Sequence, residues 1–264
     1  MPAPAAPTDA GHVEAGHVDL TVADGIATLR FGHPKGNSLP GALLRRLAEA
    51  VREAGAASEA RVVVLRSEGT GPFCAGASFD ELRAIRDVAG GKEFFLGFAR
   101  LILAMRACPK LVLVRVHGKA VGGGVGVAAA ADYALAARGA SVRLSELAVG
   151  IGPFVVGPVI EKRIGAGPFA ALAVDAASWR DAEWAERHGL YASVHDSVEA
   201  LDAALDTLAR TLAASSPEAM AALKRVFWAG TEHWDRLLED RAEMSGTLVL
   251  SQFTREAIER FGRR

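Results

Sequence analysis

The most informative stretch of the chain is HGKAVGGGVGVAAAADYALA, residues 117–136. Three consecutive glycines, Gly122 to Gly124, and a fourth at Gly126 separate a valine-rich run from an alanine-rich run. Glycine destabilises the interior of helices and strands, so a cluster of this kind indicates backbone that must come close to another group. The alanine-rich run predicts a helix that opens at the glycines, and DYALAA after it predicts a strand.

The segments around this stretch alternate between predicted strands and predicted helices. RVVVLRS (61–67) and KLVLVRV (110–116) predict buried strands because of their β-branched content. VDLTVADGIATLRF (18–31) predicts a hairpin that turns at residues 23–25. The expected fold class is therefore α/β, a layered core followed by a helical C-terminal part. Helices are predicted at 41–54, 93–107, 168–173, 182–188, 198–214, 217–228, 233–249 and 251–261.

The composition is that of a soluble globular protein. Half of the 264 residues are hydrophobic, and 30 lysines and arginines balance 31 aspartates and glutamates. This balance argues against a dominant attraction to nucleic acid or to anionic membranes. Two cysteines, Cys74 and Cys108, are too few for a disulfide scaffold or a cysteine-rich metal site.

The N-terminal segment predicts neither a secretory signal nor a membrane anchor. Residues 1–17 are rich in alanine and proline, which predicts a disordered arm. They contain no basic region followed by an apolar run, and no segment of the chain has the ~20 apolar residues of a membrane span. The expected location is the cytoplasm.

Two glycine-containing loops follow the two valine-rich strands. FCAGAS (73–78) comes after one strand and VGGGVG (121–126) after the other. Two backbone N–H groups that converge on one oxygen form an oxyanion hole, which stabilises an enolate or a tetrahedral species. The alternative is that both loops are ordinary turns between a strand and a helix. Spacing alone leaves both interpretations open.

A dinucleotide-binding site is a competing hypothesis. The run 124–129 fits the pattern G-x-G-x-x-A, and Glu146 lies 22 residues after Gly124. However, these glycines follow several other predicted strands, and RLSELAVGIGP (143–153) does not predict the second strand that the fingerprint requires. The dinucleotide interpretation is therefore weak.

The glycine loops and the segments around them resemble a known family, the enoyl-CoA hydratase/isomerase (crotonase) superfamily. The resemblance extends over residues 18–262. It implies a crotonase-like spiral of ββα units (18–200), with two nearly perpendicular sheets, and a helical C-terminal trimerisation region (201–264). The matching segments are FGHPKGNSL (31–39), FCAGASFDEL (73–82), VHGKAVGGGVGVAAAADYALAARGASVRLSELAVGIGP (116–153), SWRDAEWAERHGL (178–190) and FTREAIERF (253–261).

The resemblance also implies roles for individual residues. The backbone N–H groups of Ala77 and Gly123 would form the oxyanion hole for a thioester carbonyl. Glu146 would be one of two acid–base glutamates. No metal or nicotinamide is implied, because CoA arrives as part of the substrate. The residues expected along the CoA are Lys35, Gly36, Asn37 and Ala75.

The chain departs from the family pattern at one decisive position. The other hydratase glutamate is expected three residues after Gly123, where this chain has Gly126. Ser78 also stands where many members have aspartate. Other nearby carboxylates are poor replacements, because Asp80 and Glu81 lie in the predicted first turn of a helix, where they interact with the helix dipole, and Glu161 is expected to be exposed.

The reaction is therefore open between two main alternatives. One carboxylate is enough for a 1,3-proton shift, which favours an isomerase. The runs 122–132 and 144–165, however, resemble bacterial 3-methylglutaconyl-CoA hydratase-like proteins, some of which also have glycine at the first glutamate position. We predict a hydratase of fatty-acid or branched-chain amino-acid metabolism in which Glu146 activates water, with a substrate carboxylate as a helper. A weak acyl-CoA-binding scaffold is the third alternative.

Further expectations concern assembly and packing. The resemblance implies a homotrimer or a dimer of trimers whose C-terminal helices complete a neighbour's site. The four tryptophans are predicted to be packing residues, and residues 154–158 are predicted to select the acyl group. An apolar stripe fits either an interface or the chain's own core; it consists of Leu237, Leu238, Met244 and Leu248.

Overall fold

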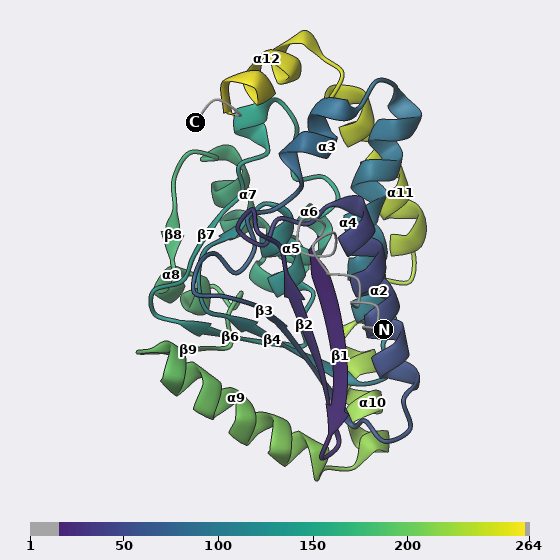
Figure 1. The fold of residues 1–264 in the computed structure, drawn as a ribbon, viewed down its shortest axis with the longest axis vertical. Helices are drawn as coiled ribbons and strands as arrows, with labels where there is room; N and C mark the ends of the chain where they lie inside the picture. The colour runs from purple at the N-terminus through teal and green to yellow at the C-terminus, as the bar shows by residue number, and fades with distance from the viewer. Residues whose placement is uncertain (1–15, 262–264) are drawn as a thin grey trace, which may run out of the picture.

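The computed structural model describes residues 16–261, and Figure 1 shows their arrangement. The predicted arm, 1–17, lies outside the described residues except at its end, where His17 already begins the first strand. Within the described part of the chain, no helix is both long and apolar enough to cross a lipid bilayer.

A six-stranded sheet forms the centre of the fold, in the order β1-β2-β3-β4-β6-β9. The first pair is antiparallel and the other four pairings are parallel. The predicted hairpin is confirmed: Asp24 and Gly25 form a two-residue turn with φ of 51° and 80°, the geometry of a type I′ turn. The strands are β1 (His17–Ala23), β2 (Ile26–Gly32), β3 (Val62–Ser67), β4 (Leu111–Val116), β6 (Tyr133–Ala137) and β9 (Ser193–His195).

Helices connect the parallel strands, as parallel pairing requires. The predicted helix 93–107 begins earlier than expected, because the Asp87 side chain accepts a hydrogen bond from Gly90 N and caps it. The connecting helices are α2 (Gly41–Ala56), α3 (Phe79–Ala84), α4 (Val88–Ala107) and α5 (Gly123–Ala129).

The sheet is covered on both faces (Figure 1). Along β3, Val62 and Val64 pack in a cluster with α9, whereas Val63 and Leu65 belong to the larger core with α2 and α4. Burial on both faces explains why the first four residues of β3 and of β4 are all apolar, without alternation. Between β6 and β9 lie η1 (Leu147–Val149), α6 (Gly157–Ile164), α7 (Ala166–Val174) and α8 (Ala182–Arg187). The helices after β9 are α9 (Val198–Ala213), α10 (Pro217–Phe227), α11 (Trp234–Leu248) and α12 (Gln252–Phe261).

A second sheet, which the family resemblance implies, has three strands in the order β5-β7-β8, and none of these strands was predicted individually. Its strands are only two or three residues long: β5 (Ala120–Val121), β7 (Ser141–Arg143) and β8 (Arg180–Asp181). Such short strands have no recognisable alternation of apolar and polar residues. This small sheet holds the glycine-rich segment next to the segment that contains Glu146.

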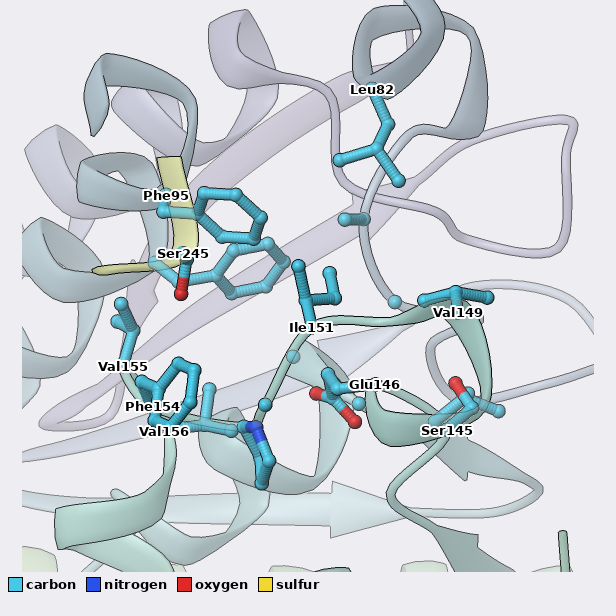
Figure 2. A pocket seen from close by; sticks show the side chains of 18 of the residues that line it. Leu82, Phe95, Ser145, Glu146, Val149, Ile151, Phe154, Val155, Val156 and Ser245 are labelled. Atoms are coloured by element: carbon cyan, nitrogen blue, oxygen red, sulfur yellow. The ribbon is translucent and has the colours of Figure 1, made fainter. Parts of the chain in front are cut away.

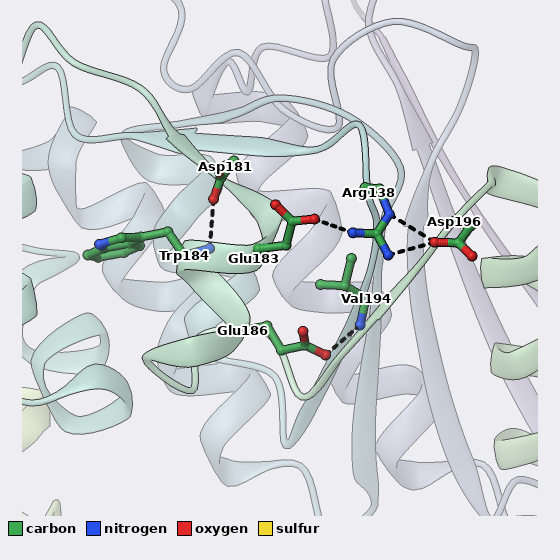
Figure 3. Close-up of polar contacts among 7 residues, drawn as sticks. All are labelled: Arg138, Asp181, Glu183, Trp184, Glu186, Val194 and Asp196. Carbon is green, nitrogen blue, oxygen red and sulfur yellow. Dashed lines mark hydrogen bonds and ion pairs between the residues drawn. The ribbon is translucent and has the colours of Figure 1, made fainter.

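The edge strand β9 is held by side chains of neighbouring elements (Figure 3). Glu186 of α8 accepts a hydrogen bond from Val194 N at 3.0 Å. Arg138 pairs with Asp196 at 2.6 Å and with Glu183. Occupied edge groups of this kind protect a sheet from pairing with another chain.

Helix α11 lies along α4, and a contact between one glycine of each helix sets the distance between the two helices. A Cβ atom on Gly91 would lie 2.7 Å from Cα of Gly246, so neither position tolerates a side chain. Only part of the predicted apolar stripe joins the core of this chain: Leu238 is buried, whereas Met244 and Leu248 are exposed. The helices α11 and α12 therefore pack on α4, α3 and η1 of their own chain.

Candidate active site

The two glycine-containing loops lie side by side. Cys74 N donates a hydrogen bond to the carbonyl oxygen of Lys119 at 3.1 Å, and Val121 N donates to that of Cys74 at 2.9 Å. A cavity of about 80 Å³ opens beside them, as shown in Figure 2. Both loops, Glu146 and the segment 151–156 line it.

The predicted oxyanion-hole residues are both at this cavity. Gly123 is the first residue of α5, so its N–H has no acceptor within the helix. Ala77 lies on the facing loop and also lines the cavity. Within residues 16–261, no protein group accepts a hydrogen bond from either N–H. Both donors are therefore free for a ligand oxygen.

Steric contacts explain why positions 122 and 123 require glycine. Gly122 has φ 51° and ψ −113°, a conformation that side chains rarely adopt. A Cβ atom on Gly122 would lie 2.9 Å from Oε1 of Glu146, and one on Gly123 would overlap the ring of Phe98. The two glycines thus allow the backbone to contact the Glu146 carboxylate and the Phe98 ring.

Glu146 follows β7, and the small sheet fixes its place. Val121 pairs with Arg143 across β5 and β7, and Gly122 N donates to the carbonyl oxygen of Arg143 at 2.9 Å. Oε2 of Glu146 is buried and accepts no hydrogen bond from the described residues. Burial raises the pKa of Glu146 to about 7, against smaller lowering effects of its own backbone N–H and of the Arg143 charge. At neutral pH this carboxyl group can therefore both accept and donate a proton.

We expect the stability of the protein to decrease as the pH rises through this range. The carboxyl ionises near pH 4.5 in the unfolded chain and near pH 7 in the folded one, so the folded state holds an extra proton between these values. The free energy of unfolding should fall by about 2–3 kcal/mol from about pH 5 to about pH 8 through this group. Urea unfolding of the wild type and of Glu146→Gln at both pH values measures this change in the free energy of unfolding. Equal pH dependence in the two proteins would contradict the prediction.

At position 126, where a second glutamate is expected, the neighbouring Val156 leaves no room for a side chain. A Cβ atom on Gly126 would lie 2.5 Å from Cγ1 and 2.7 Å from Cβ of Val156. Both residues are buried, and Val156 also lines the cavity. Gly126 is thus required by packing, and Val156 occupies the place into which a longer side chain would extend.

Gly126→Ala is therefore expected to destabilise the protein by about 1–3 kcal/mol through overpacking. Val156→Ala in the same chain removes Cγ1 but keeps Cβ, so it should relieve the shorter of the two contacts and leave the one at 2.7 Å. The double variant should therefore be more stable than the sum of the two single effects, while it retains part of the cost. Thermal unfolding of the four proteins gives the coupling energy. Gly139→Ala is the control, because a Cβ atom there meets nothing within 4 Å. Additive effects would show that Val156 does not determine the residue at 126.

The predicted CoA-contacting residues lie together in one loop region. Ala75 N donates to the carbonyl oxygen of Gly36 at 3.0 Å. The buried side chain of Asn37 organises the loop: its Nδ2 donates to the carbonyl oxygens of Glu68 and Pro72, both at 2.9 Å. Lys35 is exposed and pairs with Asp80. The roles of these residues in CoA binding stay predictions.

The other carboxylates near the site have structural partners. The Lys35 ammonium group lowers the pKa of Asp80. Glu81 accepts a hydrogen bond from Gly41 N, at the start of α2, at 2.7 Å. Ser78, at the usual aspartate position, caps α3 by accepting from Glu81 N at 3.3 Å. Glu161 is exposed on α6, as predicted.

Sequence reasoning missed part of the cavity wall. Phe95 and Phe98 of α4 and Ser245 of α11 line the cavity, and no local motif marks them. Trp179 was predicted to be a packing residue, but it is 38% exposed, with the Arg143 guanidinium 4.6 Å from its ring centroid. The expectation for Trp179 was therefore wrong, whereas Trp228 and Trp234 are buried against each other.

A sequence model of the family described as enoyl-CoA hydratase/isomerase matches residues 21–261. The chain belongs to this family. An enoyl-CoA hydratase of known structure from Mycobacterium avium superposes with a TM-score of 0.82 at 29% identity, over 93% of this chain and 96% of that one. The predicted crotonase-like fold is thereby confirmed.

Two proteins with a more specific name are also similar to this chain. Both are named (7aS)-7a-methyl-1,5-dioxo-2,3,5,6,7,7a-hexahydro-1H-indene-carboxyl-CoA hydrolase. The Mycobacterium tuberculosis protein is 30% identical over 205 residues, which is 76% of this chain and 79% of that protein. The Rhodococcus jostii protein is 35% identical over 132 residues, so the match spans about half of each chain (50% and 51%).

Proposed function

We propose that this protein adds water to the double bond of an enoyl-CoA, with Glu146 as its single acid–base group. The observation that carries the proposal is the Glu146 carboxyl, whose Oε2 is buried with no hydrogen-bond donor among the described residues, beside two free backbone N–H groups. Burial raises the pKa of this carboxyl to about 7. The family membership and the similarity to an enoyl-CoA hydratase support it.

In this reaction the Ala77 and Gly123 N–H groups bind the thioester oxygen. Glu146 takes a proton from water while the water oxygen bonds to the β-carbon, and the alkene electrons move to the thioester oxygen as an enolate. The protonated Glu146 then gives its proton to the α-carbon, which restores the carbonyl. One hydroxyl and one hydrogen are added, and the carboxylate is regenerated. The proposed steps need proton transfer and enolate stabilisation alone.

We further propose that the acyl group is neutral. Among the described residues that line the cavity, Glu146 is the one with a chargeable side chain. A second carboxylate in this apolar space would be desolvated without a cationic partner. This argues against the 3-methylglutaconyl group that the finer sequence resemblance favours.

A second candidate reaction is hydrolysis, because two relatives carry a hydrolase name. Water activated by Glu146 would then attack a carbonyl carbon of the acyl-CoA instead of an alkene carbon. The same two N–H groups are suited to the oxyanion that forms.

Incubation with a panel of enoyl-CoA thioesters in heavy water separates these reactions by product mass. The panel contains straight, branched and cyclic neutral acyl groups, and 3-methylglutaconyl-CoA. Addition of a whole water supports the proposal. A shifted double bond with deuterium uptake and no added water would make the protein an isomerase, and release of free acid or ring opening would make it a hydrolase. Binding without any change of mass would leave an acyl-CoA-binding scaffold.

We also propose that the chain assembles into a homotrimer or a dimer of trimers. Helix α10 exposes Leu223, Val226 and Phe227 on its surface, which is consistent with an apolar contact between subunits. Size-exclusion chromatography with light scattering measures the molar mass, and a monomer at micromolar concentration would overturn the proposal.

A further inference from the structure

Two polar side chains of the cavity, Ser145 and Ser245, are not used by the proposed reaction. The polar side chains among the described lining residues are Ser145, Glu146 and Ser245. Figure 2 shows that Ser145 and Glu146 lie on one side, whereas Ser245 lies on the other, near Phe95 and Val155, with its hydroxyl directed into the cavity. Ser245 is therefore separated from the reacting groups.

The Ser245 hydroxyl has hydrogen-bonding capacity to spare. Its side chain is buried at 1% exposure, and Oγ donates one long hydrogen bond, 3.2 Å, to the carbonyl oxygen of Arg241 one helical turn earlier. This bond uses the hydroxyl hydrogen, and no group among residues 16–261 donates to the hydroxyl lone pairs, which a ligand hydroxyl could therefore reach. A back-bond of this kind slightly destabilises a helix.

Helix packing holds this hydroxyl in place. The next residue, Gly246, is in contact with Gly91 of α4, which fixes the rotation of α11 toward the cavity. Phe95, one turn further along α4 from Gly91, lines the same part of the cavity. The position of Ser245 is thus set by the rigid contact of two helices and not by a loop.

We propose that Ser245 determines specificity by hydrogen-bonding a neutral oxygen atom, a ketone or a hydroxyl, in the part of the acyl group that is remote from the thioester. The proposal rests on the proposed function for the place of the thioester at Ala77 and Gly123. A ketone would accept from Oγ in place of the Arg241 carbonyl, and a hydroxyl would donate to the free lone pairs. A remote carboxylate would find no cation among the described lining residues.

Calorimetric binding of saturated acyl-CoAs tests the proposal without turnover. The probes are octanoyl-CoA and its 5-, 6- and 7-oxo and hydroxy derivatives, which place the oxygen at successive distances from the thioester. The wild type should bind at least one oxygenated derivative roughly three- to tenfold more tightly than octanoyl-CoA. In Ser245→Ala this ratio should fall to about one.

Two further variants make the result decisive. Ser145→Ala, at the other serine of the cavity, should keep the wild-type ratio. Ser245→Cys retains the size of the side chain with a weaker hydrogen-bonding group, so it should lose the preference even if Ser245→Ala fails to fold. Equal affinities in the wild type, or a preference that survives both Ser245 variants, would overturn the proposal. Failure of the hydratase proposal would be seen separately, as the absence of water addition in heavy water.

Discussion

Replacement of Glu146 by glutamine is expected to lower kcat by about 10²- to 10⁴-fold, with little change in the affinity for acyl-CoA. Glutamine has the shape of glutamate but cannot take a proton from water or return one to carbon. Steady-state kinetics with the best substrate of the heavy-water panel, together with a binding measurement, separate the two effects. The matched control is Glu161→Gln, a change of the same kind at an exposed position of α6, which should keep wild-type turnover.

The pH profile adds a second criterion for the role of Glu146. If its ionised form takes the proton from water, kcat/KM should rise with pH and level off above about pH 7, where the carboxyl is ionised. The residual kcat/KM of Glu146→Gln should not show this rise with pH. Full turnover in the glutamine variant would exclude every reaction in which this carboxyl transfers a proton.

The second large effect is expected for Gly122→Ala. The added Cβ atom would occupy a backbone conformation with φ 51° and would lie 2.9 Å from Oε1 and 3.3 Å from Cδ of Glu146. Backbone strain of this kind costs about 1–3 kcal/mol, and the carboxylate must move as well. We expect a loss of stability of that size, and a fall in kcat of about 100-fold because misplacement by about 1 Å has such an effect.

Chemical unfolding and steady-state kinetics of the same preparation measure both quantities. Gly167→Ala serves as the control, because a Cβ atom there meets nothing within 4 Å and the position lies in α7. The control should be neutral or slightly stabilising, since alanine is favoured over glycine in helices. If Gly122→Ala had the same stability and kcat as the control, the close approach of Gly122 to Glu146 would contribute to neither quantity.

Local chemistry made much of the fold predictable from sequence. The hairpin of β1 and β2 follows from Asp24-Gly25 between two β-rich runs, since these residues tolerate the positive φ of a tight turn. β3 and β4 follow from their valine runs, because a strand buried on both faces must be apolar on both. The glycine loops could be located for the same reason, since close approach of backbone requires glycine.

Long-range packing explains what the sequence did not reveal. β5, β7 and β8 have two or three residues each, so they exist through their partners and not through a propensity of their own. Ser245 reaches the cavity because α11 packs on α4 through Gly246 and Gly91, and no pattern local to α11 reports that contact. The place of Glu146 was predicted from a family motif, but the cause of its raised pKa, burial, is a property of the folded chain.

The contact between Gly126 and Val156 also limits the order in which such a site can diverge. A glutamate cannot enter at position 126 while the valine at 156 is in place, whereas a smaller residue at 156 can arise first. A lineage that loses the glutamate and then enlarges residue 156 therefore does not regain it in one step without overpacking, and residue 156 must become smaller first. Relatives of this protein should accordingly vary at these two positions together, with glutamate at the first only where the second is small.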